Sequence, residues 1–272
     1  MGKKSYKWIV QLFSVELRKV MIYRVDFWLQ FIMSIFANVG VAYFLWKAIF
    51  EYKNVDMMGG FSFHSLMFYY LMVPVIGKLI TGPGFANFAQ EIYDGSLTRY
   101  LIFPVSFFLF RYTTFLAGVT LYFSQFILAI FLFLFFFGIP PDISLSWASF
   151  LMTACVIFGA GLLSFTLYSA IEMVAFWADN VWSLVVTIRY SVSLMGGGLI
   201  PLSFFPDIYQ KILYFLPFSY MVNFPINCFL GRISLSQFIS GMCIITLWIL
   251  VFGMLTFIIW EKGRYKYTGV GI

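Results

Sequence analysis

Apolar residues occur along this chain in long runs that contain no charged side chain. A helix needs about 20 such residues, at about 1.5 Å each, to cross the hydrocarbon core of a bilayer. Five runs are long enough: Phe27–Trp46, Met57–Gly77, Tyr112–Pro141, Ile143–Ile171 and Ile233–Trp260. A sixth run, Asn180–Ile200, is interrupted only by Arg189. The pattern predicts an all-α integral membrane protein with six transmembrane helices.

Residues 4–24 have a different pattern, in which polar side chains follow one face of a helix. Lys7, Gln11, Ser14 and Arg18 recur every three or four residues, and apolar side chains cover much of the remaining surface. Such a helix lies in the headgroup layer with its apolar side toward the lipid. We therefore expect an amphipathic interfacial helix ahead of the first span.

The run Ile212–Gly231 is also uncharged, but prolines interrupt it and the residues before it. They are Pro201, Pro206, Pro217 and Pro225. Proline breaks a helix, and a broken helix persists at membrane depth only where protein or a water-filled cavity surrounds it. We expect residues 201–231 to form a re-entrant or surface-lying hairpin on the outer face, between the fifth and sixth spans.

The distribution of basic residues orients the chain in the membrane. With six spans, twelve of the 17 Lys and Arg lie on the side of the two termini, four lie on the other side, and Arg189 lies in the membrane. Lys and Arg accumulate on the cytoplasmic side of membrane proteins. Both termini are therefore expected in the cytoplasm, and the net charge of +6 does not indicate a nucleic-acid partner.

Composition excludes a soluble domain and offers little chemistry. Hydrophobic residues make up 62% of the chain and charged residues 10%, against about 45–50% and about 25% in soluble proteins. We expect one transmembrane domain, residues 1–272. The single histidine, His64, has no metal-ligand neighbour, and the three cysteines have neither zinc nor disulfide spacing. The chain is thus predicted to bind no cofactor and to be no enzyme.

The predicted cytoplasmic loop 83–104 is the segment best suited to docking. Phe88, Ile92 and Tyr93 recur at helical spacing, Gly95 fits the end of a helix, and a second apolar face follows around Leu97. This pattern predicts an amphipathic helix–glycine–helix element that binds another protein. A connector that merely lies on the membrane is the alternative.

Arg189 is the most unusual charge in the predicted spans. A basic side chain at the membrane centre costs about 2.5–3.5 kcal/mol, so it should find a partner or face water. Glu172 and Asp179 are the nearest carboxylates in the sequence. A structural ion pair and a position facing a transport pathway both remain open.

Several short segments, in their order and spacing, resemble the type-2 ABC exporter permeases. The resemblance lies in the branch commonly encoded beside a second, related permease and an ATPase. It is carried by Tyr23–Phe27, Phe44–Phe50, Ile92–Leu97, Leu101–Pro104, Ala175–Trp177, Gly198–Leu202, Phe205–Pro206, Leu216–Phe218 and Pro225. It covers nearly the whole chain.

The resemblance implies a permease subunit of an ATP-driven exporter in the bacterial cytoplasmic membrane. Two permease subunits, identical or related, would surround a pathway for drugs, lipids, polysaccharides or other surface molecules. Two cytoplasmic ATP-binding subunits would carry ATP and Mg. Residues 83–104 would form the coupling loop, residues 4–24 the connecting helix, and residues 201–231 a cap on the pathway. The implied ATPase-facing residues are Glu91, Ile92, Tyr93, Asp94, Gly95, Leu97 and Arg99.

Two other classes of membrane protein are alternatives. A secondary transporter would need ionisable residues in several spans and symmetry between its halves, but only Arg189 and Glu172 qualify. A membrane-integral lipid-modifying enzyme would need a cluster of polar catalytic residues at one depth.

Overall fold

The described part of the chain is mainly helical. The computed structural model describes residues 7–82, 87–102, 105–178 and 180–269. Its elements are α1 (Lys7–Ile22), α2 (Arg24–Lys53), β1 (Met57–Met58), β2 (Phe61–Ser62), α3 (Phe63–Thr81), α4 (Asn87–Tyr93), α5 (Thr98–Leu101), α6 (Phe107–Phe137), α7 (Trp147–Glu172), the 3-10 turn η1 (Met173–Phe176), α8 (Trp182–Met195), η2 (Leu202–Phe204), α9 (Asp207–Phe215), η3 (Pro217–Met221), α10 (Asn223–Phe229) and α11 (Leu235–Gly263).

Five helices of the described residues are long and apolar enough to cross a membrane, namely α2, α3, α6, α7 and α11. The predicted sixth span, Asn180–Ile200, contains the 14-residue α8. At about 1.5 Å per residue, α8 extends about 21 Å, which is less than the ~30 Å hydrocarbon core. It ends at Met195, Gly196 is its C-cap, and Gly197 has a positive φ of 89°.

The second predicted span begins later than the sequence indicated. Met57–Ser62 was included in it, but these residues form a β-hairpin in which Met57 pairs with Ser62 and Met58 pairs with Phe61. Gly59 and Gly60 make the turn with positive φ angles. The segment is apolar enough to extend the run, whereas its backbone is not helical until Phe63.

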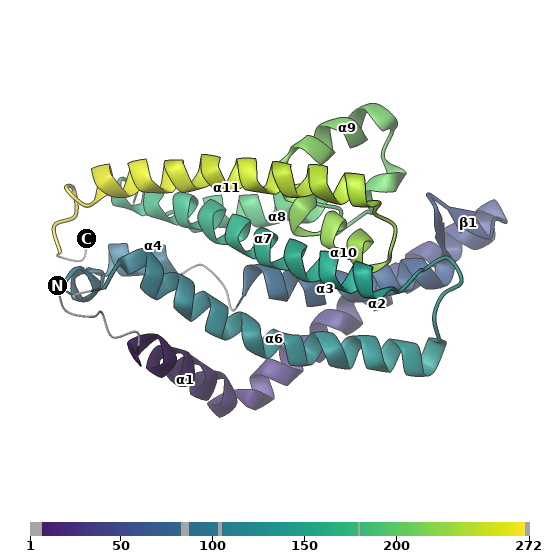
Figure 1. Ribbon diagram of the computed structural model, residues 1–272, viewed down its shortest axis with the longest axis horizontal. Helices are drawn as coiled ribbons and strands as arrows, with labels where there is room; N and C mark the ends of the chain where they lie inside the picture. Colours follow the sequence, from purple (N-terminus) through teal and green to yellow (C-terminus); the bar gives the residue numbers. More distant parts are fainter. Residues whose placement is uncertain (1–6, 83–86, 103–104, 179, 270–272) are drawn as a thin grey trace.

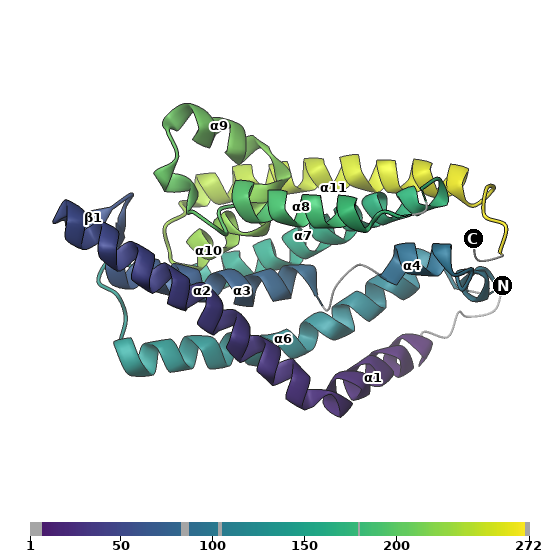
Figure 2. The same ribbon diagram turned by 180° about the vertical axis from the view of Figure 1, so that it is seen from behind.

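The long helices run alternately up and down the bundle. Figure 1 shows α1, α4 and the last turns of α11 at one end of the molecule, and the β1–β2 hairpin and α9 at the other. The predicted interfacial helix is α1, which packs against α6 and lies beside the start of α2 (Figure 2).

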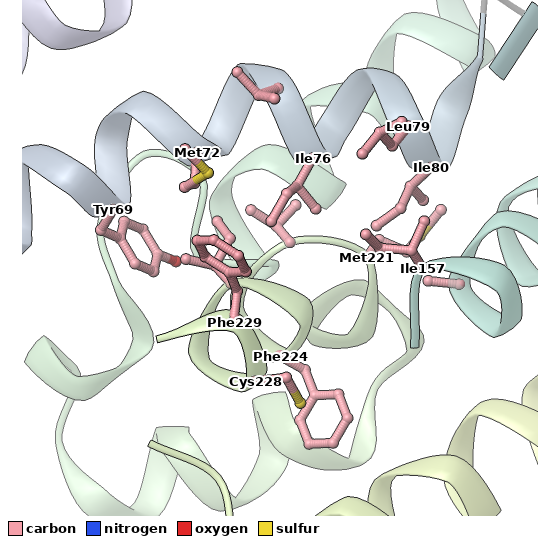
Figure 3. Close-up of a cluster of buried hydrophobic side chains, with 14 of the residues drawn as sticks. Tyr69, Met72, Ile76, Leu79, Ile80, Ile157, Met221, Phe224, Cys228 and Phe229 are labelled. Atoms are coloured by element: carbon pink, nitrogen blue, oxygen red, sulfur yellow. The ribbon is translucent and has the colours of Figure 1, made fainter. Parts of the chain in front are cut away.

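The core of the bundle is built around α3. Its side chains Tyr69, Met72 and Ile76 point toward the segment that carries Met221 and Phe229 (Figure 3), and all five are at most 1% exposed. Because lipid tails are as apolar as these side chains, close packing stabilises such a core more than the hydrophobic effect does. The segment 217–230 is thus an interior element of the bundle.

The chain between α8 and α11 is broken at three of its four prolines, whereas Pro225 lies in the first turn of α10. Pro206 immediately precedes α9, and Pro217 is the first residue of η3. The tyrosines of α3 satisfy the irregular backbone: Tyr69 donates to the carbonyl of Gly197 (2.8 Å) and Tyr70 to that of Leu199 (2.8 Å). Between α8 and α11, the described residues form no continuous helix. Their free backbone groups find hydrogen-bond partners within the protein, as a broken helix at membrane depth requires.

A polar cluster joins three connections at the end of the bundle that carries the β-hairpin. Arg232 forms an ion pair with Asp142 (2.6 Å), and its guanidinium lies 3.7 Å from the ring centre of Phe61. The hydroxyl of Ser62 donates a hydrogen bond to Asp142 (2.7 Å). Burial alone would raise the pKa of Asp142, but hydrogen bonds from Ser65 and Ser62 outweigh it and hold the pKa below its ordinary value. The ionised carboxylate therefore ties α3 to the α6–α7 and α10–α11 connections.

Close packing of α11 on α10 requires glycine at position 241. A Cβ there would lie 2.2 Å from the Phe224 ring, and Phe224 is buried at 4% exposure. Overpacking of this kind typically costs ~1–3 kcal/mol. We expect Gly241→Ala to lower the melting temperature of the protein in detergent.

Gly253 provides the matched control, since it lies in the same helix and a Cβ there meets nothing within 4 Å. Gly253→Ala should leave the melting temperature unchanged or raise it, because alanine favours a helix by about 1 kcal/mol over glycine. Equal destabilisation by the two substitutions would contradict the close contact at Gly241.

Candidate functional site

Two short helices, α4 and α5, form a compact element at the end of the bundle where α1 and the last turns of α11 also lie (Figure 1). Gly95 separates them with a φ of 75°, which residues with a side chain rarely adopt. The N–H of Leu97 donates to the carbonyl of Glu91 (3.0 Å) and closes the turn. The predicted helix–glycine–helix pattern is confirmed, whereas residues 83–86 and 103–104 of the predicted loop lie outside the described residues.

The last residue of α7 holds the beginning of α4. Glu172 is 1% exposed, and its Oε2 accepts a hydrogen bond of 2.9 Å from the N–H of Phe88. The first N–H groups of a helix have no partner within the helix and carry partial positive charge. The hydrogen bond to the side chain of Glu172 therefore fastens α4 to α7.

A second carboxylate fastens α4 to α6. Glu91 forms an ion pair with Arg111 and accepts a hydrogen bond of 3.1 Å from the hydroxyl of Tyr100. The guanidinium of Arg111 lies 5.8 Å from the ring centre of Phe88 and 5.5 Å from that of Phe107. Stacking on aromatic faces and a carboxylate partner are what a half-buried arginine requires.

The C-terminal segment fastens the glycine turn. Tyr267 donates its hydroxyl to the carbonyl of Gly95 (2.5 Å) and accepts from the N–H of Thr98 (3.0 Å). Below the turn, an apolar cluster joins the element to α6, η1 and α11, and its buried members are Phe88, Ile92, Leu97, Phe107, Met173 and Trp260. The α4–α5 element is thus held by α6, α7 and the end of the chain.

The seven residues predicted to face an ATPase divide into two groups. Tyr93, Asp94 and Arg99 are exposed. The other four point into the protein or are covered by it: Glu91, Ile92, Gly95 and Leu97. Hydrogen bonds from the hydroxyl and N–H of Ser96 hold the pKa of Asp94 below its ordinary value. Asp94 and Arg99 therefore place opposite charges on the exposed surface.

The structure does not pair Arg189 with Glu172. Arg189 is exposed, and the ion pairs of the described residues do not include it. Glu172 is engaged by the backbone of α4 instead, and Asp179, the other candidate partner, lies outside the described residues. The alternative interpretation, that Arg189 faces a pathway, stays a prediction.

The four prolines of the predicted hairpin lie toward the opposite end of the bundle from the α4–α5 element. Pro201, Pro217 and Pro225 are buried, and Pro206 is exposed. In the part of the chain that the structure describes, no group of three or more His, Cys, Asp or Glu side chains is arranged to hold a metal ion.

Arg111 and Tyr267 contribute to the site but were not predicted as site residues. In the sequence, Arg111 was one of the twelve basic residues expected on the cytoplasmic side, with no sign of a partner. Tyr267 is 172 residues from the carbonyl that it binds. Local periodicity carries no information about partners at that separation.

Comparison with known proteins identifies a family. A family model described as "ABC-2 family transporter protein" matches residues 36–271. This range includes all five long helices in whole or in large part and the α4–α5 element. No curated protein matches the chain.

The ion pair that fastens α4 predicts a specific pattern of stabilities. Arg111→Met leaves the carboxylate of Glu91 without its ion-pair partner, in surroundings where both side chains are less than a fifth exposed. Removing one partner of such a pair costs about 3 kcal/mol, whereas replacing both is often nearly neutral. We expect a lower melting temperature for Arg111→Met and recovery of most of the loss in Arg111→Met with Glu91→Gln.

The exposed pair of Arg264 and Glu261 (2.6 Å) serves as the control. Arg264→Met should change the melting temperature little, since exposed pairs contribute ~0–1 kcal/mol. Strictly additive effects of the Arg111 and Glu91 substitutions would show that the pair does not hold α4.

Proposed function

The chain belongs to the ABC-2 transporter family, and on this premise we propose that it is the permease subunit of an ATP-driven exporter whose α4–α5 element receives the ATP-binding subunit. Membership makes the chain a multi-pass membrane protein of a transport family rather than of a catalytic one. Members of the family work with ATP-binding subunits. The observation that carries the proposal is that the α4–α5 element is attached to two membrane-spanning helices and also exposes charged side chains.

An element that transmits force has to be attached firmly to the helices that it moves and expose a surface to the subunit that drives it. The α4–α5 element fits both requirements. Glu172 and Arg111 attach it to α7 and α6, while Tyr93, Asp94 and Arg99 are exposed. Motion of this element would thus act directly on two membrane-spanning helices.

The proposed assembly contains two permease subunits, identical or related, and two ATP-binding subunits, which bind ATP and Mg. A single copy of this chain leaves large apolar side chains exposed along α2, including Phe36 at 76% and Phe44 at 75%. Lipid or the second permease subunit would cover them.

We propose that the chain crosses a bacterial cytoplasmic membrane six times, with both ends in the cytoplasm. Five full crossings alone would place the ends on opposite sides, yet α1 and the end of α11 lie at the same end of the bundle (Figure 1). The short α8 and the turn after it would supply the sixth crossing. The 12-to-4 distribution of Lys and Arg supports this orientation, and residues 201–231 would re-enter the membrane from the outer side as a cap.

The exposed charges of the α4–α5 element provide the test of docking. We expect Asp94→Lys with Arg99→Glu to weaken co-purification of a subunit with Mg-dependent ATP hydrolysis by at least about tenfold, since like charges facing each other at an interface cost several kcal/mol. The melting temperature should fall only slightly, because both side chains are exposed and Asp94 accepts hydrogen bonds only from the neighbouring Ser96.

Lys53→Glu with Asp56→Lys is the matched control, since Lys53 is the last residue of α2, Asp56 follows three residues later, and both are exposed. It should leave co-purification intact. Normal co-purification of the Asp94 and Arg99 variant would show that the ATP-binding subunit docks elsewhere.

Cysteine labelling tests the number of crossings. In a background without Cys155, Cys228 and Cys243, Lys211→Cys on the exposed face of α9 should react with a membrane-impermeant maleimide in intact cells. Lys266→Cys should react only after the cells are permeabilised. Reaction of Lys266→Cys in intact cells would overturn the six-crossing topology.

A further inference from the structure

Two basic side chains line one cavity between the membrane-embedded helices. The cavity has a volume of about 430 Å³ and is lined by residues of α2, α3, α7, α8 and η3. Among the described residues that line it, Lys78 and Arg189 carry the charges. We call it the cationic groove. Figure 2 shows α2 and α8 on the same side of the molecule.

Neither cation has an acidic partner among the described residues. Lys78 lies 5.8 Å from the ring centre of Tyr122, and neither it nor Arg189 takes part in an ion pair of the described chain. The two charges repel one another electrostatically. Glu172 interacts electrostatically with Arg189 but forms no ion pair with it among the described residues.

Such an arrangement is unfavourable in the absence of an anion. Each basic side chain at membrane depth costs free energy unless a counter-charge or water compensates it, and the mutual repulsion of two cations adds to that cost. A ligand with a negative charge would relieve both terms at once. Ser34, Asn38 and Ser193 also line the groove and add polar groups around the two cations.

The remaining wall of the groove is apolar. Val73 of α3, Val192 of α8 and the residues Met221 and Val222 line it. A small hydrated anion would leave this wall unused, whereas an amphiphile would place its headgroup on the cations and its apolar part on the wall. The wall therefore favours an amphiphilic ligand over a free anion.

We propose that the cationic groove binds the anionic headgroup, a phosphate or a carboxylate, of an amphiphilic cargo. The inference rests on the proposed transport function and adds the chemical class of the cargo. Lys78 and Arg189 act as the binding residues, with charge-assisted hydrogen bonds to the headgroup.

Direct binding to the full chain in neutral detergent tests the proposal. Dioctanoyl phosphatidic acid is the anionic probe, dioctanoyl phosphatidylcholine is the probe without net charge, and affinities are measured by native mass spectrometry and calorimetry. We expect phosphatidic acid to bind about tenfold or more tightly than phosphatidylcholine. Lys78→Gln and Arg189→Gln should each weaken its binding about tenfold, since hydrogen bonds to charged groups contribute at this level.

Matched variants distinguish loss of a positive charge in the cationic groove from loss of folded protein. Arg189→Lys keeps the charge and should retain most of the affinity, and Lys211→Gln removes an exposed cation of α9 and should retain all of it. Melting temperatures identify any variant that fails to fold, in which case the difference in affinity between the two lipids decides. Equal binding of the two lipids, or unchanged affinity in both glutamine variants, would overturn the proposal.

Inorganic phosphate distinguishes the two sources of the anionic group. Weak competition by phosphate is expected if the apolar wall contributes to binding. Competition at the same concentration as phosphatidic acid would overturn the amphiphilic part of the proposal and leave a free-anion site. These measurements need no ATP-binding subunit, so their failure is distinct from failure of the docking test on Asp94 and Arg99.

Discussion

Lipid offers no hydrogen-bond partner to a peptide group, so the protein itself must satisfy every break in a helix at membrane depth. This chain breaks after α8, and the hydroxyls of Tyr69 and Tyr70 on α3 reach the freed carbonyls of Gly197 and Leu199. The broken segment therefore has to pack against α3. As a consequence, α3 is enclosed by protein while α2 and α11 remain largely exposed, and the bundle is organised around its second span.

Hydropathy predicted the long helices because an uncharged run of about 20 residues has few stable alternatives in a membrane. It failed where apolar residues do not form helix. Met57–Ser62 is apolar but turns at Gly59 and Gly60, and α8 ends after 14 residues because glycines follow it. The prolines indicated correctly that residues 201–231 are broken. They did not indicate that Phe224 and its neighbours would fill the interior of the bundle.

The candidate site shows the same division between local and distant information. Periodicity and Gly95 predicted the two short helices, since the signals lie within the segment. The orientation of these helices depends on Arg111, Glu172 and Tyr267, which are remote in sequence. For that reason Glu91, predicted to face an ATPase, is instead directed at α6. Sequence proximity likewise suggested an Arg189–Glu172 pair, whereas the structure directs Glu172 to the backbone of α4.

The end of α7 joins the two regions to which we assign functions. Glu172 holds the start of α4, and Tyr168, four residues earlier, lines the cationic groove. Side chains four residues apart lie on the same face of a helix, one turn from each other. A displacement of α4 that pulls on Glu172 is therefore applied to the groove wall within a single helical turn. Coupling between the proposed docking surface and the proposed cargo site would then need no long chain of intermediates, because one helix carries both contacts.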